Sequence, residues 1–159
     1  MRFTHTSSYP ADSATVFAMF ADPAFRERVC TAQGSLRSSV SLALSDLGGE
    51  ALVEQVLPAV GLPSYAAKFV GPEIEVRRRE RWRDPADGNL EIGIPGKPGD
   101  LVATIRLDEA DGATTVRYDG ELSVSIPLIG GKLERFVADL FSSALDVEAQ
   151  TGAAYLAGG

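Results

Sequence analysis

The chain has 159 residues, 45% of them hydrophobic and 23% charged, which fits one globular domain spanning residues 1–159. Its formal net charge of −7 argues against nucleic acid and anionic membranes as general partners. The single cysteine excludes an intrachain disulfide, and Met1–Pro10 contains no apolar signal-peptide core. No apolar run is long enough for a transmembrane helix, so we expect a cytoplasmic protein.

The first part of the chain predicts a strand followed by two short helices. Threonine and aromatic residues alternate with polar ones up to Tyr9, as in a strand. Asp12 is an expected N-cap for the first helix, and Asp22 followed by Pro23 is an expected start of the second. Gly34 is the expected stop of that second helix.

The middle of the chain alternates with period 2 and predicts six strands. Gly48-Gly49 is expected to form the first turn between them, and Leu62–Val70 a short helix or a lid-like loop. The six predicted strands are 35–44, 50–57, 73–83, 89–94, 101–108 and 114–126.

The C-terminal segment predicts one long helix that reaches about Tyr155. Its apolar residues recur at a spacing of three to four: Leu133, Phe136, Val137, Leu140, Phe141, Ala144, Leu145 and Val147. The opposite, polar side is assigned to Lys132, Glu134, Arg135, Asp139, Glu148 and Gln150.

This order of elements predicts an α+β fold. Neighbouring strands joined by short turns pair antiparallel, which gives a sheet of about seven strands with two short helices between strands 1 and 2. A sheet with one wet face buries the other, and only the final helix is long enough to cover it.

Three stretches resemble the START-like, helix-grip superfamily, which includes birch-pollen-allergen and polyketide-cyclase relatives. They are Tyr9–Phe17 with the following Asp22-Pro23, Glu80-Arg81-Trp82, and Ile126–Glu134. The resemblance implies a curved antiparallel sheet wrapped around the C-terminal helix, with a cavity between them. Leu62–Val70 and Gly130-Gly131 would control entry to that cavity. Folds of this kind host many functions, so the resemblance is more specific for fold than for activity.

The resemblance and the inward-facing pattern together predict a set of ligand-binding residues for a hydrophobic small molecule. We assign no catalytic residue, metal ligand or cofactor, and the oligomeric state stays open. The predicted ligand-binding residues are Tyr65, Phe69, Arg78, Glu80, Trp82, Ile92, Ile94, Tyr118, Leu122, Phe136, Leu140, Phe141 and Ala144.

Two interpretations of Arg78 and Glu80 stay open, because both lie on the apolar face of their strand. They form either a polar end of the pocket that holds a ligand carboxylate or hydroxyl, or, with no role in binding, a salt-bridged pair or a frayed strand end that faces water. The outward arginines Arg77, Arg79, Arg81 and Arg83 are expected to form a solvated face paired with neighbouring carboxylates.

Three functions therefore remain possible on the sequence. The first is binding or transport of a lipid, polyketide or aromatic metabolite. The second is a cyclase or hydratase that uses Glu80 and His5, the only histidine, as an acid–base pair. The third is a protein-interaction module resembling chaperone activators, which predicts a solid core. Cys30 is interpreted as structural, because a nucleophile would need the remote His5 as its partner.

Overall fold

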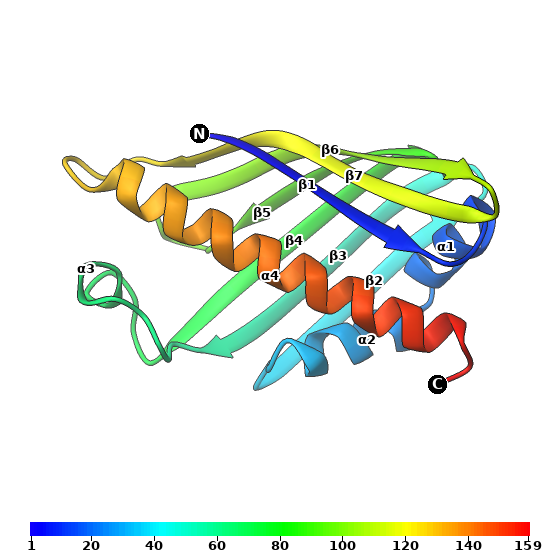
Figure 1. The fold of residues 1–159 in the computed structure, drawn as a ribbon. Coiled ribbons are helices and arrows are strands. Elements are labelled where there is room, and N and C mark those ends of the chain that lie inside the picture. Colours follow the sequence, from blue (N-terminus) through cyan, green and yellow to red (C-terminus); the bar gives the residue numbers. More distant parts are fainter.

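The computed structural model describes residues 1–159 and contains seven strands and four helices (Figure 1). The predicted order of strand, two short helices, six strands and long helix is confirmed. The elements are β1 (Arg2–Tyr9), α1 (Ser13–Phe20), α2 (Pro23–Ala32), β2 (Arg37–Ser45), β3 (Gly48–Pro58), α3 (Ser64–Ala67), β4 (Glu73–Asp84), β5 (Asp87–Gly93), β6 (Gly99–Ala110), β7 (Ala113–Val124) and α4 (Gly130–Leu156).

Both predicted N-caps are present. The Asp12 carboxylate accepts a hydrogen bond from the backbone N–H of Thr15 at 2.8 Å, and the Asp22 carboxylate accepts one from Ala24 at 2.9 Å. Each bond satisfies an N–H group that the first helical turn leaves without a partner. These caps fix where α1 begins after β1 and where α2 begins after α1.

The seven strands form one antiparallel sheet in the order β1-β7-β6-β5-β4-β3-β2. Each strand from β2 to β6 pairs with the next strand along the chain, whereas β1 pairs with β7, the last strand of the series. The sheet curves around α4, which runs diagonally across its concave face (Figure 1). The predicted helix-grip class is therefore confirmed.

One predicted turn is wrong by two residues. The β2–β3 turn is formed by Asp46 and Leu47, and Gly48 and Gly49 already belong to β3. Both glycines have positive φ, +93° and +131°. A Cβ at Gly49 would lie 1.9 Å from the Ala43 carbonyl oxygen, so these glycines permit a close approach of two backbones.

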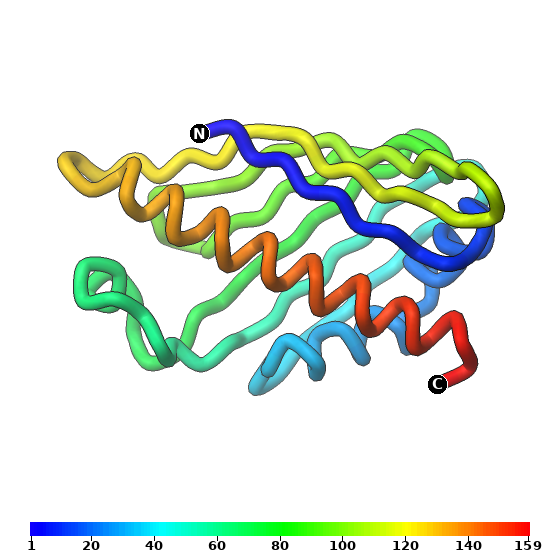
Figure 2. The backbone as a smooth tube through the Cα atoms, in the orientation of Figure 1, coloured from blue at the N-terminus to red at the C-terminus, as the bar shows by residue number.

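Buried side chains of the core fill the end of the molecule where α1 and α2 meet the C-terminal half of α4. Aromatic rings pack edge to face there: the Phe17 and Trp82 centroids are 5.3 Å apart, and those of Phe25 and Tyr155 are 5.4 Å apart. The Tyr155 hydroxyl also donates to the Asp22 carboxylate. The trace in Figure 2 shows α4 running from this filled end to the opposite end, near α3.

Candidate functional site

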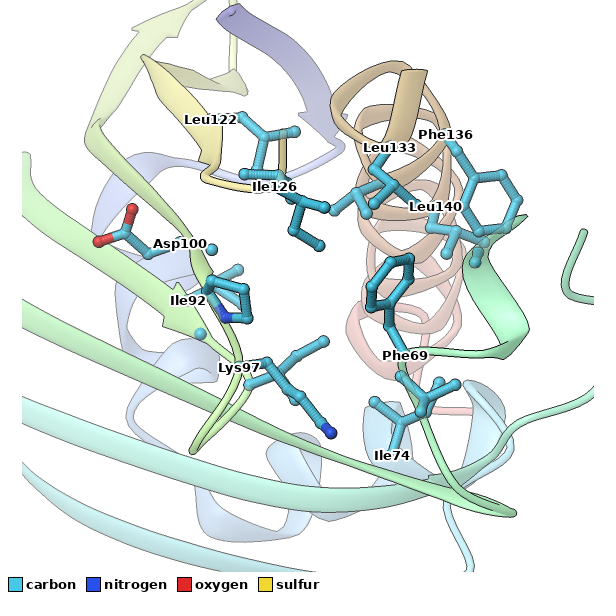
Figure 3. Close-up of a pocket in the computed structure, with 18 of the residues that line it drawn as sticks. Phe69, Ile74, Ile92, Lys97, Asp100, Leu122, Ile126, Leu133, Phe136 and Leu140 are labelled. Atoms are coloured by element: carbon cyan, nitrogen blue, oxygen red, sulfur yellow. The ribbon is translucent and has the colours of Figure 1, made fainter. Parts of the chain in front are cut away.

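A cavity of about 340 Å³ lies at the end of the molecule away from α1 and α2. Its walls come from the N-terminal half of α4, the segment around α3, the start of β4, the β5–β6 turn and the end of β7 (Figure 3). These segments come from three separate stretches of the chain, around residues 62–74, 92–100 and 122–141, which the fold brings together.

The cavity lining is mostly apolar: 15 of its 21 residues are hydrophobic. Small-molecule sites usually combine such a lining with a few polar groups. The hydrophobic side chains come from every wall. The 21 lining residues are Leu62, Ala66, Phe69, Val70, Ile74, Ile92, Gly93, Ile94, Gly96, Lys97, Pro98, Gly99, Asp100, Leu122, Val124, Ile126, Leu133, Phe136, Val137, Leu140 and Phe141.

The helical wall follows from the spacing of the α4 stripe. Leu133, Phe136, Val137, Leu140 and Phe141 recur every three or four residues, so they lie on one side of the helix, and all of them line the cavity. Farther along the same side, the helix meets packed side chains instead of open space. The same apolar stripe therefore lines the cavity in the N-terminal half of α4 and packs into the core farther along the helix.

The segment around α3 forms the outer wall. Ala66 and Phe69 line the cavity, whereas the Tyr65 ring packs edge to face against Phe136, with centroids 6.4 Å apart. The Lys132 ammonium lies 4.1 Å from the centroid of the Tyr65 ring. A cation over an aromatic face is attracted to it, so Tyr65 links α3 to the first turns of α4.

Seven of the thirteen predicted ligand-binding residues line this cavity, and six do not. The seven are Phe69, Ile92, Ile94, Leu122, Phe136, Leu140 and Phe141. Tyr65 packs behind Phe136, and the Ala144 carbonyl accepts a hydrogen bond from Gln33 Nε2 at 3.0 Å. The other four take part in a buried polar cluster deeper in the molecule.

That polar cluster is built around Glu80, whose two carboxylate oxygens accept four hydrogen bonds. Arg26 donates to both oxygens, at 2.7 and 2.8 Å, Arg78 Nε donates at 2.7 Å and Trp82 Nε1 donates at 2.8 Å. Arg78 Nη1 also donates to Glu148 at 2.7 Å, and the Tyr118 hydroxyl donates to Glu148 at 3.2 Å. Of the two interpretations of Arg78 and Glu80, the structure agrees with the salt-bridged pair.

The electrostatics of this cluster keep it charged. Burial alone would raise the pKa of the Glu80 carboxyl, but Arg26 and Arg78 outweigh burial and the pKa lies well below its usual range. For Tyr118, burial and then the Glu148 carboxylate raise the pKa, so the hydroxyl keeps its proton. Two guanidinium groups face two carboxylates, which makes the cluster internally neutral.

Two members of the cluster were not recognised in the sequence. The helical spacing predicts Glu148 on the polar side of the last helix, and this prediction is wrong: Glu148 is 3% exposed and faces Arg78. Arg26 is also 3% exposed. Its signal was present, because Phe25, Arg26, Val29 and Cys30 occupy one side of α2 at helical spacing.

Neither member of the suggested acid–base pair lines the cavity. Glu80 is enclosed in the ion cluster, and His5 Nε2 lies 3.2 Å from Asp146 Oδ1 near the middle of α4. On the outer face, Arg77 pairs with Glu54 at 3.1 Å and Arg81 with Glu50 at 3.3 Å. The prediction of a solvated arginine face paired with carboxylates is confirmed for Arg77, Arg81 and Arg83, whereas Arg79 forms no ion pair.

The sheet gripping one long helix, with an apolar cavity beneath that helix, defines this chain as a helix-grip protein. Crystal structures with the same fold include TTHA0849 from Thermus thermophilus (TM-score 0.66, 14% identity, 96% of this chain and 94% of that one). Protein Ms6760 from Mycobacterium smegmatis (0.65, 16%, 99% and 91%) and Ara h 8.0201 (0.61, 13%, 95% and 97%) share it too.

More particularly, the chain belongs to the family described as "Protein of unknown function (DUF2505)", whose sequence model matches residues 4–156. It is 27% identical over 113 residues to the uncharacterized protein Rv0481c of Mycobacterium tuberculosis and equally to Mb0491c of Mycobacterium bovis. Each alignment covers 65% of this chain and 65% of the relative's length. None of the protein's helices is both long and apolar enough to cross a membrane.

Proposed function

We propose that this protein binds an apolar small molecule in the cavity under the N-terminal half of α4, as a carrier or sensor. The observation that carries the proposal is the lining itself, in which 15 of 21 residues are hydrophobic. The volume of the cavity, about 340 Å³, falls within the range of roughly 300–1,000 Å³ that small-molecule sites enclose. A lipid chain, a polyketide or an aromatic metabolite has the chemistry to fill such a space.

Physical chemistry supplies the driving force. Apolar atoms that face an open cavity lack the van der Waals contacts that packed atoms have. An apolar ligand supplies those contacts, and its transfer from water into the cavity is itself favourable. The protein-interaction alternative predicts a solid core, and this cavity argues against it. No observation favours the cyclase or hydratase alternative, because Glu80 and His5 lie outside the lining.

The test fills the cavity from α3. Ala66 is buried and lines the cavity, whereas its neighbour Ala67 is exposed. Ala66→Phe places a ring in the proposed binding space, and Ala67→Phe adds the same ring on the solvent side. The probe is N-phenylnaphthylamine, a neutral dye whose fluorescence rises in apolar surroundings.

We expect Ala66→Phe to weaken dye binding by about tenfold or more, which corresponds to about 1.4 kcal/mol. Ala67→Phe should leave the affinity within about twofold of the wild type. Equal affinity of the wild type and Ala66→Phe would place dye binding elsewhere and contradict the proposal. Native mass spectrometry of the purified protein would then show whether a natural ligand co-purifies.

A further inference from the structure

The lysines of this protein have an uneven distribution. Its sequence contains three, Lys68, Lys97 and Lys132, among 15 basic residues. Lys68 follows α3 directly, Lys97 lies in the β5–β6 turn and Lys132 in the first turn of α4. All three positions are on segments that wall the cavity, and the rest of the surface carries arginine only.

These lysines are also free of ion pairs. Every ion pair in the protein uses an arginine, His5 or the N-terminal amine as its cation. The lysines lie against the cavity walls instead. The Lys68 ammonium is 5.5 Å from the centroid of Phe69, and the Lys132 ammonium covers Tyr65. Lys97 is itself part of the lining.

The nearby carboxylates do not neutralise this rim. Asp100 is an exposed neighbour of the fully buried Leu101 in β6, so alternation turns its side chain toward the outer face. Figure 3 shows its carboxylate pointing away from the apolar side chains, while the Lys97 ammonium extends on the side of Ile74. Glu134 in α4 accepts hydrogen bonds from the Val124 N–H and the N-terminal amine.

An apolar cavity with a rim of unpaired ammonium groups suits an amphiphile with a negative head group. We propose that the ligand is an anionic amphiphile of the long-chain carboxylate class, with its chain in the cavity and its carboxylate at the lysine rim. This inference rests on the proposed function, because it names the ligand class of the same cavity. Lysine suits the task, because its long flexible stem follows a head group whose position varies with chain length.

The protein as a whole is acidic, with a net charge of −7, and would repel a carboxylate on average. An ionised carboxylate also enters an apolar site less readily than an alcohol of equal length, because its desolvation costs more. A preference for the carboxylate over the alcohol therefore requires local cations, which the rim supplies.

The experiment compares decanoate with decanol, which have the same chain, by displacement of N-phenylnaphthylamine near pH 8. We expect the wild type to bind decanoate more tightly than decanol. Lys97→Met should weaken decanoate binding by about tenfold, or about 1.4 kcal/mol, and leave decanol and the dye within about twofold. Replacing all three lysines by methionine should abolish the preference. The control Arg83→Met removes one exposed cation from the outer face and should change none of these affinities.

Two outcomes overturn the inference and are distinct from each other. If decanol and the dye bind but decanoate binds no better, and Lys97→Met affects all three equally, the ligand class is wrong while the cavity proposal stands. If neither the dye nor decanol binds, the proposed function itself fails and the inference fails with it. High salt offers a second readout, because it should weaken decanoate binding and leave decanol unchanged.

Discussion

The buried ion cluster predicts a large and pH-dependent cost for removing one charge at its centre. In Glu80→Gln the side chain keeps its shape and stays 1% exposed, but one of its two acceptor oxygens becomes an NH₂ group. Each oxygen accepts two hydrogen bonds, so in either orientation the new NH₂ group faces two donors. Arg26 and Arg78 are then left with Glu148 as the one carboxylate in the cluster.

The magnitude follows from these contacts. Hydrogen bonds to charged groups contribute about 1.5–3 kcal/mol each, and breaking a buried ion pair by removing one partner costs about 3–5 kcal/mol. We therefore expect the free energy of unfolding of Glu80→Gln to be about 3–5 kcal/mol lower near pH 7. The matched control is Glu91→Gln on the outer face, where an exposed ion pair with Arg81 at 3.8 Å is worth at most about 1 kcal/mol.

The dependence on pH gives a second test. The folded-state pKa of Glu80 lies below that of the unfolded chain, so its ionisation contributes stability that is fully present above the unfolded value of about 4.3. That contribution is lost as pH falls below this value toward the folded pKa. The gap between the wild type and Glu80→Gln should therefore be constant near pH 7 and narrow by about 1.4 kcal/mol per pH unit below about pH 4.

Urea denaturation followed by tryptophan fluorescence measures both effects, since the protein has one tryptophan, Trp82, which donates to Glu80. Urea carries no charge and leaves the electrostatics unscreened, in contrast to guanidinium. A loss below about 1 kcal/mol at neutral pH, similar to Glu91→Gln, would refute the account of the cluster. An unchanged gap between pH 7 and pH 3 would refute the direction of the Glu80 pKa shift.

Two further substitutions test the filled end of the molecule by thermal or urea unfolding. Gly152→Ala should lower the free energy of unfolding by about 2 kcal/mol, because the new Cβ would lie 2.4 Å from Tyr9 Cε1 and α4 would have to move outward. The control Gly131→Ala, with no atom within 4 Å of the new Cβ, should be neutral or slightly stabilising; a similar loss in both would contradict the packing argument. Tyr9→Phe should be neutral or stabilising by up to about 1 kcal/mol, because the Tyr9 hydroxyl is buried with no hydrogen-bond partner; a clear loss would show that the hydroxyl is bound after all.

Much of the fold was accessible from the sequence because its determinants are local. Asp12 and Asp22 cap helices within three residues of themselves, and alternation along β4 marks its inward face. The stripe of α4 follows from a spacing of three to four residues. The one misplaced turn depended on a contact between different strands, since Gly49 makes room for the Ala43 carbonyl group.

The site could be predicted only in part from the sequence. The alternation of apolar and polar residues identifies which face of a strand is buried, but not where along that face a cavity opens. Trp82 and Ile74 share the inner face of β4, yet Trp82 is 4% exposed in the filled core while Ile74 lines the cavity. Glu148 was misplaced for a related reason. Burial of its charge depends on Arg78, which lies 70 positions earlier in the chain, and no local pattern reports such a partner.

The two halves of α4 differ in what they contribute: the C-terminal half stabilises the fold, and the N-terminal half covers the proposed binding site. Its C-terminal half is fixed by Gly152 against Tyr9, by Glu148 in the ion cluster and by Tyr155 on the Asp22 carboxylate. Its N-terminal half spans the cavity and meets α3 through Tyr65. Leaving apolar side chains such as Phe136 and Phe141 beside open space forfeits packing energy, and the filled end has to offset that loss. A helix held firmly at one end can cover open space at the other without losing its place on the sheet. The proposed binding of a ligand therefore involves the N-terminal half of α4 and leaves the contacts of its C-terminal half in place.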